Sequence, residues 1–207
     1  KMQVNKKFNE WEKLVNKILK DVWEFRNLCD KPFDRGFIGE LLVLSQLLDT
    51  YKKKLCSNEN NDIIYSGSSN KKWDMALKLN KKIIQINAKA TSELDKNGKP
   101  KWVRQSAKSF CDVNLKNFKQ KVSPLKIKPD PYFYYVYVDV KTWLKNHKVN
   151  LFTVSEKNAF SIFGKKYFKE HNGRVRKGKN KISDDFWVKY DDIKNFEDKN
   201  LRKLCLK

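Results

Sequence analysis

The sequence predicts an α/β fold, in which a central mixed β-sheet is flanked by helices within a single domain. Three observations support this class. Two long segments near the N-terminus repeat apolar residues at helical spacing, short runs of β-branched and aromatic residues follow, and strand and helix patterns alternate in the second half. The length of 207 residues suits one or two domains. Because no repeat or linker interrupts it, we assign residues 1–207 to one domain.

The first helix is predicted from Phe8 to Leu28. Its apolar residues recur at spacings of three and four, which places them on one face of a helix. The residues of this face are Trp11, Val15, Ile18, Val22 and Phe25. Pro32 and Gly36 mark the end of the segment. Nothing in it indicates chemistry, so we interpret it as a packing helix.

A second helix is predicted from about Phe37 to Lys54. Its central sequence, G-F-I-G-E-L-L-V-L-S-Q-L-L, is nearly continuous in apolar residues, so the helix is expected to be buried on several sides. Glu40 is the lone acid in that part. It either interacts with the helix N-terminus, which is worth a few tenths to about 1 kcal/mol, or directs its carboxylate to a functional site. In both cases a buried carboxylate needs a hydrogen bond or a cation beside it.

The stretch from Trp73 to Thr91 predicts a β-hairpin. Two apolar runs, Met75–Leu79 and Ile83–Ile86, flank a polar turn that Asn80 opens. Side chains alternate along the second strand between two faces. One face carries Gln85, Asn87 and Lys89, and the other carries Ile84, Ile86 and Ala88.

A metal site follows if Asp74 lies beside Asn87 across this hairpin. A carboxylate, an amide and the Lys89 ammonium would then converge, and carboxylate and amide oxygens are ligands that suit Mg²⁺. Such a group is suited to attack on a phosphodiester. The alternative is a solvated hairpin, in which Asp74 starts a strand and Lys89 lies on an exposed face.

Further strands are predicted from short apolar runs between turn-forming residues. They are Ile63–Tyr65, Trp102–Gln105, Tyr132–Val140, Asn150–Val154 and Phe186–Tyr190. The dense run at Tyr132–Val140 is expected inside a sheet with its tyrosines in the core, although tyrosines also stack on bases. Phe186–Tyr190 is expected at an edge.

The remaining helices are predicted from weaker patterns. Phe110–Val122 is assigned to a weak helix, and Lys141–His147 to a short one. Ser155 is expected to cap a helix that reaches about Lys169, and Ile193–Leu206 is expected to close the domain.

The charge of the chain indicates its class of partner. Lys and Arg number 46 against 24 Asp and Glu, which gives a net charge of +22. A polyanion would relieve the self-repulsion of such a chain. Nucleic acid is the first candidate, an anionic membrane surface is the second, and a lysine-rich composition from an AT-rich genome is the third explanation.

Other features limit location and chemistry. No apolar run approaches the roughly 18 residues of a membrane span, and no signal core precedes the first helix, so a soluble cytoplasmic protein without a membrane partner is expected. The four cysteines show no C-x-x-C spacing, which gives no indication of a zinc site. His147 and His171 have no neighbouring metal ligands in the sequence, and P-loop and G-x-S-x-G motifs are absent.

The ordered residues of the helix and hairpin resemble the core of the PD-(D/E)XK nucleases, particularly the type II restriction endonucleases. They are G-F-I-G-E-L-L-V with Glu40, then Asp74, then Asn87-Ala88-Lys89. The resemblance covers roughly Gly36 to Thr91, and it implies a restriction endonuclease-like fold with a catalytic core at about residues 36–155. Two positions depart from the pattern: Trp73 replaces the expected proline, and Asn87 replaces the expected acid. A neutral amide binds Mg²⁺ less strongly than a carboxylate does.

The resemblance also implies roles. Asp74 would be the principal Mg²⁺ ligand, assisted by the side-chain oxygen of Asn87 and the backbone carbonyl of Ala88. Lys89 would contact the attacking water and the scissile phosphate, as base or as electrostatic stabiliser. Glu40 would orient a water on the metal or support a second metal.

The activity implied is that of a Mg²⁺-dependent endonuclease on double-stranded DNA, most simply a sequence-specific type II restriction enzyme. Cleavage of a palindrome would favour a homodimer. Two alternatives stay open: a structure-specific or repair nuclease such as a junction resolvase, and a non-catalytic basic nucleic-acid-binding protein. Base and phosphate contacts are expected from the loops at residues 95–108 and 171–181. The candidate DNA-binding residues there are Lys101, Arg104, Arg174, Arg176, Lys177 and Lys179.

Overall fold

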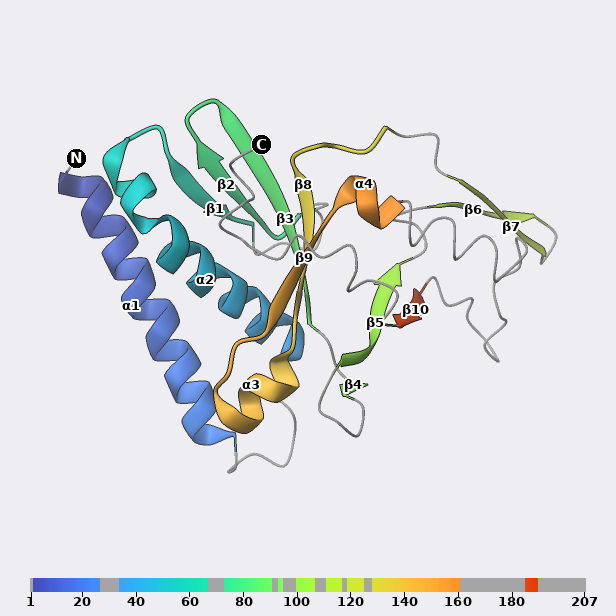
Figure 1. Cartoon of the computed structure of the whole chain (residues 1–207), viewed down its shortest axis with the longest axis horizontal. Helices are drawn as coiled ribbons and strands as arrows, with labels where there is room; N and C mark the ends of the chain where they lie inside the picture. The colour runs from blue at the N-terminus through green and yellow to red at the C-terminus, as the bar shows by residue number, and fades with distance from the viewer. Residues whose placement is uncertain are drawn as a thin grey trace.

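A mixed five-stranded sheet forms the centre of the structure, which is a computed structural model (Figure 1). The structure describes residues 2–26, 34–66, 73–90, 93–94, 100–106, 111–116, 119–124, 128–160 and 185–189. The strand order is β1-β2-β3-β8-β9. The strands are β1 (Asp62–Tyr65), β2 (Met75–Leu79), β3 (Lys82–Ala90), β8 (Phe133–Val138) and β9 (Leu151–Ser155). β3 and β8 run parallel while the other neighbours are antiparallel, which confirms the α/β class with a mixed sheet.

Two long helices, α1 (Met2–Phe25) and α2 (Arg35–Ser57), pack together against one face of this sheet (Figure 1). Asp34 caps α2, because its carboxylate accepts hydrogen bonds from the backbone N–H groups of Gly36 and Phe37 at 2.8 and 3.3 Å. α2 is buried on several sides, as its nearly continuous apolar sequence predicts. Its side chains share one core with Ile84 and Ile86 of β3.

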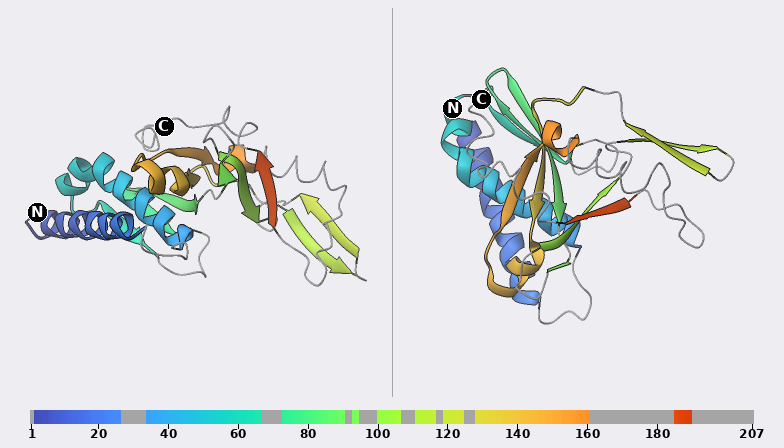
Figure 2. Two further views of the ribbon diagram at one scale, coloured as in Figure 1. Left: turned by 90° about the horizontal axis from the view of Figure 1, so that it is seen from below. Right: turned by 45° about the vertical axis from the view of Figure 1, so that its right-hand side comes forward.

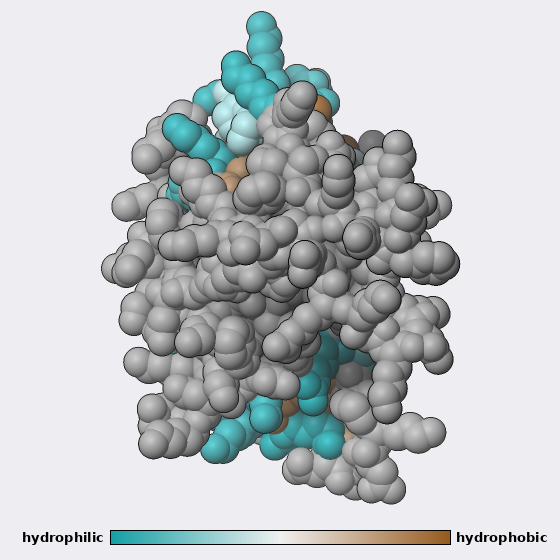
Figure 3. Space-filling view, turned by 90° about the vertical axis from the view of Figure 1, so that its right-hand side faces the viewer, coloured by the Kyte–Doolittle hydropathy of each residue, from teal (hydrophilic) through white to brown (hydrophobic). Residues whose placement is uncertain are grey.

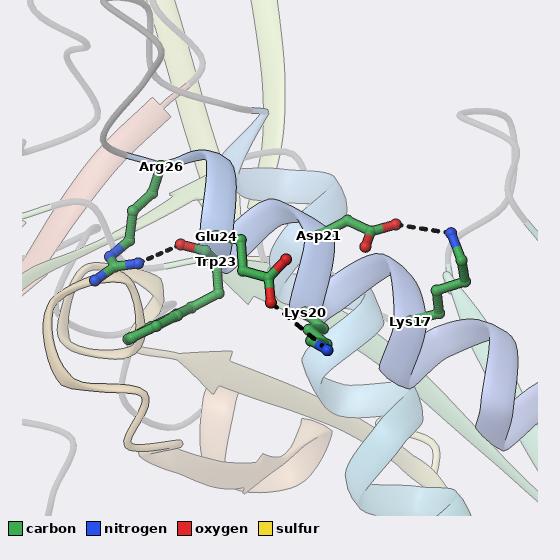
Figure 4. A network of polar contacts seen from close by, with 6 residues as sticks. All are labelled: Lys17, Lys20, Asp21, Trp23, Glu24 and Arg26. Atoms are coloured by element: carbon green, nitrogen blue, oxygen red, sulfur yellow. Dashed lines mark hydrogen bonds and ion pairs between the residues drawn. The ribbon is translucent and has the colours of Figure 1, made fainter.

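The stripe predicted on α1 is confirmed in its middle and fails at its end. Val15 is buried and Trp11, Ile18 and Val22 pack against the core, but Phe25 is 54% exposed. The outer surface near this end carries ion pairs between Lys and acidic residues four positions apart (Figure 4). The pairs are Lys17–Asp21 and Lys20–Glu24, at 3.0 and 3.6 Å. Exposed pairs of this kind contribute only a few tenths of a kcal/mol each.

The side chain of Arg26 caps the C-terminal end of α1. Arg26 lies with its guanidinium carbon 3.4 Å from the ring centroid of Trp23, and it also donates a hydrogen bond to the Trp23 carbonyl (Figure 4). Stacking and carbonyl capping both favour a cation at a helix C-terminus. α1 is therefore a packing helix, as expected from its sequence.

The β2–β3 hairpin is held to the end of α2 by three asparagines. Asn80 opens the turn with a left-handed φ of 55°, a conformation that asparagine tolerates. The buried Asn61 accepts a hydrogen bond from the Asn80 N–H at 2.6 Å and donates one to the Lys54 carbonyl at 2.7 Å. Asn58 donates to the Asn80 side chain at 2.9 Å. The predicted hairpin is confirmed, and its second strand reaches beyond the apolar run Ile83–Ile86 to Ala90, so that it includes Asn87 and Lys89 as predicted.

α2 and β3 approach each other closely where Gly39 faces Ala90. A Cβ atom on Gly39 would lie 3.3 Å from the Cβ of Ala90, which is tighter than ordinary packing. Glycine therefore allows the first turns of α2 to lie against the end of β3. This contact sets the position of Glu40, the next residue on the helix.

The other face of the sheet is built largely from β8. Phe133, Tyr135 and Tyr137 are buried there, together with Val154 of β9. The prediction that these tyrosines belong to the core is confirmed, as is the internal position of their strand. Tyr132, just before β8, is exposed.

Two smaller sheets lie beyond the main one (Figure 2). The first has the order β10-β5-β4, with β4 (Glu93–Leu94), β5 (Pro100–Ser106) and β10 (Asp185–Lys189), so the predicted edge position of β10 is confirmed. The second pairs β6 (Cys111–Lys116) with β7 (Lys119–Pro124). The helix predicted at Phe110–Val122 is therefore wrong. Its apolar residues Val113 and Leu115 alternate with polar ones at a period of two, which is the period of a strand.

Two short helices complete the described elements. α3 (Val140–Asn146) begins at Asp139, which caps it, and ends at His147 with a left-handed φ of 61°. α4 (Glu156–Ala159) begins at Ser155, which accepts a hydrogen bond from the Asn158 N–H at 3.3 Å, so the predicted cap is confirmed. The extension of that helix towards Lys169 and the helix predicted at Ile193–Leu206 lie outside the described residues.

The surface of the described part is largely polar where it can be seen. On the face drawn in Figure 3, the described residues that are visible lie towards the two ends and are mostly hydrophilic. Among the described helices, none is both long and apolar enough to cross a membrane.

Candidate active site

Asp74 lies across the hairpin from Asn87, as the metal-site prediction requires. The last residue pair in the β2–β3 register is Met75 with Ile86. Asp74, which precedes Met75, therefore lies opposite Asn87, just beyond the paired part of the two strands. The Asp74 N–H donates to the Ile86 carbonyl at 2.9 Å, and its Oδ2 accepts from the Ala88 N–H at 2.7 Å. Asp74 is thus fixed by the peptide groups on both sides of Asn87.

Burial makes the Asp74 carboxylate harder to ionise. Desolvation raises the pKa of Asp74, while the hydrogen bond from Ala88 and the positive charge of Lys89 lower it, and the net direction is upward. A carboxylate in this state is stabilised by any further positive charge that reaches it.

Glu40 extends from α2 to the same place. The Tyr65 hydroxyl, at the end of β1, donates a hydrogen bond to Glu40 Oε2 at 2.5 Å. Burial raises the pKa of Glu40, the Tyr65 hydrogen bond lowers it, and the neighbouring charges of Asp74 and Asp34 raise it again. Lys89 lowers it somewhat, and the net direction is upward.

The position of Glu40 resolves the two roles that the sequence left open. The first turn of α2 contains no acid, and the helix N-terminus is capped by Asp34 instead. Glu40 is half-buried and directs its carboxylate to Tyr65, within the electrostatic influence of Asp74 and Lys89. Its carboxylate therefore lies in this cluster and not at the helix end.

The face of β3 that carries Lys89 lies away from α2. Ile84 and Ile86 belong to the core that the helices cover, and alternation puts Asn87 and Lys89 on the opposite face. Asn87 is 8% exposed and Lys89 is half-buried, and they are in register with Tyr135 and Tyr137 of β8. Lys89 is thus held between an acidic pair and an aromatic strand.

The donor set of this cluster fits a hard divalent cation. Carboxylate and amide oxygens are what Mg²⁺ prefers, and Mg²⁺ usually keeps several waters, so few protein ligands suffice. One oxygen of each carboxylate accepts a hydrogen bond that orients the group, Oε2 of Glu40 and Oδ2 of Asp74. In the described part of the chain no group of three His, Cys, Asp or Glu side chains could hold a metal. A cation here would therefore bind to Asp74 and Glu40, with amide and peptide oxygens from Asn87 and Ala88.

Two of the six predicted DNA-binding residues belong to the part of the chain that the structure describes. Lys101 and Arg104 lie on β5, where Arg104 is in register with Trp187 of β10. Arg174, Arg176, Lys177 and Lys179 lie outside the described residues, as does His171.

Tyr65 is the member of the cluster that the sequence analysis missed. It was assigned only to a short strand, and it lies 25 residues from Glu40 in the chain. The contact exists because β1 is placed beside β2, next to the beginning of α2. The signal that could have found it is a hydroxyl-bearing residue at the end of the strand that precedes Asp74.

Comparison with protein-family models, with curated proteins and with solved structures finds no significant match to this chain. The resemblance to the PD-(D/E)XK nucleases therefore stays a prediction. The functional proposal below depends on the geometry of the cluster around Glu40, Asp74 and Lys89.

Proposed function

We propose that this chain is a Mg²⁺-dependent endonuclease that hydrolyses phosphodiester bonds in double-stranded DNA and has a restriction endonuclease-like core. One observation carries the proposal: Glu40, Asp74 and Lys89 converge from three separate elements at one end of the central sheet. Glu40 comes from α2, Asp74 lies directly before β2, and Lys89 comes from β3. Two carboxylates that can hold a metal, together with a lysine that can act on a phosphate, are the groups that phosphodiester hydrolysis requires.

Asp74 and Glu40 would hold the metal, with weaker support from the Asn87 amide and the Ala88 carbonyl. When bound, a divalent cation supplies activation of water and neutralisation of charge on the phosphate. The hydrogen bonds from Ala88 to Asp74 and from Tyr65 to Glu40 orient the two carboxylates before any ligand arrives.

Lys89 would act on the phosphate. Its charge already acts on both carboxylates, so a phosphate placed beside them would come within reach of the ammonium. There the charged Lys89 would stabilise the negative charge that develops in the transition state, or the neutral amine of Lys89 would accept a proton from the attacking water. The aromatic residues of β8 flank Lys89 and limit water on its strand side.

The substrate assignment rests on charge and on the resemblance. A net charge of +22 favours a polyanion, and the resemblance to type II restriction endonucleases favours sequence-specific cleavage by a homodimer. A junction resolvase or repair nuclease would use the same cluster on branched or damaged DNA.

A second candidate function is a basic DNA-binding protein without catalysis. The neutral Asn87 in place of an acid favours it, because it removes one charged ligand from the cluster. Metal-dependent cleavage separates the two functions.

The test is cleavage of a long linear duplex with Mg²⁺, comparing the native chain with Lys89→Ala. Lys81→Ala is the matched control, since Lys81 lies on the same hairpin at its exposed tip. We expect discrete fragments from the native chain and from Lys81→Ala, and a loss of about 100-fold or more in rate with Lys89→Ala. The absence of cleavage on linear and branched DNA with Mg²⁺ and Mn²⁺ would leave the non-catalytic function.

A further inference from the structure

The β6–β7 pair forms a two-stranded ribbon that is separate from the two other sheets. Its register runs from Cys111 opposite Pro124 to Lys116 opposite Lys119 without a shift. Residues directly opposite each other in an antiparallel pair lie on the same side of the sheet, and neighbours along a strand lie on opposite sides. The register therefore assigns every position of the ribbon to one of two faces.

The two faces differ in chemistry. One face holds Asp112, Asn114, Lys116, Lys119, Lys121 and Ser123. The other holds Cys111, Val113, Leu115, Gln120, Val122 and Pro124. The first face thus combines three lysines with one aspartate, and the second has no charged residue. The lysines are concentrated at the end of the ribbon where Lys116 pairs with Lys119.

The ribbon and the helix α1 lie at opposite ends of the molecule (Figures 1 and 2). In Figure 1, α1 is drawn on the left, the ribbon on the right, and the strands β8 and β9 between them. The helices cover the first face of the five-stranded sheet, whereas Asn87 and Lys89 are on the second. A ligand bound at the ribbon is therefore clear of α1, which lies at the opposite end of the molecule.

We propose that the β6–β7 ribbon binds duplex DNA through the face that holds Lys116, Lys119 and Lys121. Duplex DNA as the partner rests on the proposed function, whereas the basic face rests on the register alone. A two-stranded ribbon fits the major groove, which is about 12 Å wide. Lysines on its face neutralise phosphates and release counterions, and the amide of Asn114 has the donor and acceptor that base edges require.

The test replaces the three lysines by glutamine in the full chain: Lys116→Gln, Lys119→Gln and Lys121→Gln together. The matched control removes the same charge elsewhere, with Lys13→Gln, Lys53→Gln and Lys81→Gln at exposed positions on α1, α2 and the hairpin tip. The affinity for a 30-bp duplex is measured against salt concentration in Ca²⁺. We expect the ribbon variant to bind at least roughly tenfold more weakly at low salt, with a slope of log K against log salt shallower by about 2 to 3. The control triple should keep the native slope.

A triple Lys→Arg variant at the same ribbon positions keeps the positive charge. It tests whether weaker DNA binding by the Lys→Gln variant results from lost charge or from misfolding of the ribbon. It should bind with the native slope, and loss of binding in this variant as well would contradict a role for charge. Equal slopes for the ribbon and control triples would overturn the proposal. So would failure of the native chain to bind duplex at any salt, or its preference for single-stranded RNA or anionic vesicles.

The outcomes separate this proposal from the nuclease proposal. A native chain that binds duplex through the ribbon lysines but never cuts it would overturn the nuclease activity and leave the ribbon assignment standing. A native chain that cuts discrete sites while both triples behave alike would overturn the ribbon assignment alone.

Discussion

Tyr65 makes one contact in the site, and that contact determines how Glu40 is presented. Its hydroxyl is 2.5 Å from Glu40 Oε2, so it orients a carboxylate that has no other hydrogen-bond donor among the described residues. Burial, followed by the hydrogen bond to Glu40, raises the pKa of Tyr65 above its usual range. Tyr65 is therefore a positioning residue for Glu40, the side chain that we propose as a metal ligand.

We expect Tyr65→Phe to weaken metal binding by roughly 10- to 100-fold, because outer hydrogen bonds to metal ligands typically contribute that much. Calorimetric titration with Mn²⁺ measures it directly, and the Mg²⁺ dependence of cleavage gives a second readout. Tyr132→Phe, at an exposed tyrosine before β8, is the control. Cleavage at saturating metal should recover much of the native rate, whereas an unchanged metal affinity would remove Tyr65 from the site.

Asp74 is expected to cost stability when no metal is bound. Its folded-state pKa is raised by burial, so the unfolded chain ionises more readily, and stability falls as the pH rises from the usual carboxyl range through the folded-state pKa. Below that range both states are protonated and the penalty is absent. A site built for ligand binding commonly carries such a cost.

We therefore predict that Asp74→Asn raises the thermal midpoint at pH 7 without metal and that the gain shrinks as the pH falls towards 4. The asparagine oxygen can still accept the Ala88 hydrogen bond. Mg²⁺ should stabilise the native chain but not the variant. Thermal unfolding from pH 4 to 8, with and without Mg²⁺, measures both effects. A variant less stable than the native chain across this range would contradict the assignment.

At the scale of elements, the contact between α2 and β3 sets the distance between the acid on the helix and the lysine on the strand. Gly39, the residue that precedes Glu40 in α2, lies against Ala90 of β3. Protein interiors are closely packed, so they resist any added side-chain volume. A larger side chain at position 39 must displace the helix, and Glu40 moves with it.

We expect Gly39→Val to destabilise the fold by about 1–3 kcal/mol and to lower cleavage at least tenfold. Gly39→Ala should be milder, because its gain in helix propensity of about 1 kcal/mol offsets part of the strain. Adding Ala90→Gly to Gly39→Val should restore part of both losses, and Gln46→Val further along α2 is the control. Chemical denaturation and cleavage rates measure the effects. A double variant no better than Gly39→Val would show that the close approach does not position the site.

The sequence predicted some elements well and others poorly, for physical reasons. The hairpin from Met75 to Ile86 could be predicted because one face is buried and a turn residue lies between two short runs. The β6–β7 ribbon was missed because its strands carry few apolar residues, so that the alternation of Val113 and Leu115 with polar residues is short. The contact of Glu40 with Tyr65 depends on which strands are neighbours, and local pattern does not contain that information.

At the scale of the whole molecule, the charge of +22 shapes stability as well as binding. Uniform positive charge repels itself in the compact state, and the ion pairs seen on α1 offset little of it. The resemblance of the chain to the PD-(D/E)XK nucleases and its net charge could both be found from the sequence alone. The grouping of three lysines on one face of the β6–β7 ribbon could not, because it depends on the pairing register of the two strands.

We expect the thermal midpoint to rise by several degrees between about 20 and 200 mM NaCl at pH 7, since screening lengths shorten over this range. Duplex DNA at constant ionic strength should raise it further, because a ligand of the native state stabilises it. Differential scanning calorimetry measures both. A midpoint independent of salt would show that the charge is already compensated within the fold.

The parallel pairing of β3 with β8 has a consequence for how the protein is made. Gln85 pairs with Phe133, so a ribosome that adds roughly 5–20 residues per second needs about 2–10 s to supply the partner of β3. Until then β3 is an unpaired edge of a nascent sheet, and such edges join with other chains. Asn87 and Lys89 lie on that edge, and a charge and an amide discourage such pairing. The side chains proposed for hydrolysis are thus also of the kind that disfavours edge-to-edge pairing of a nascent sheet.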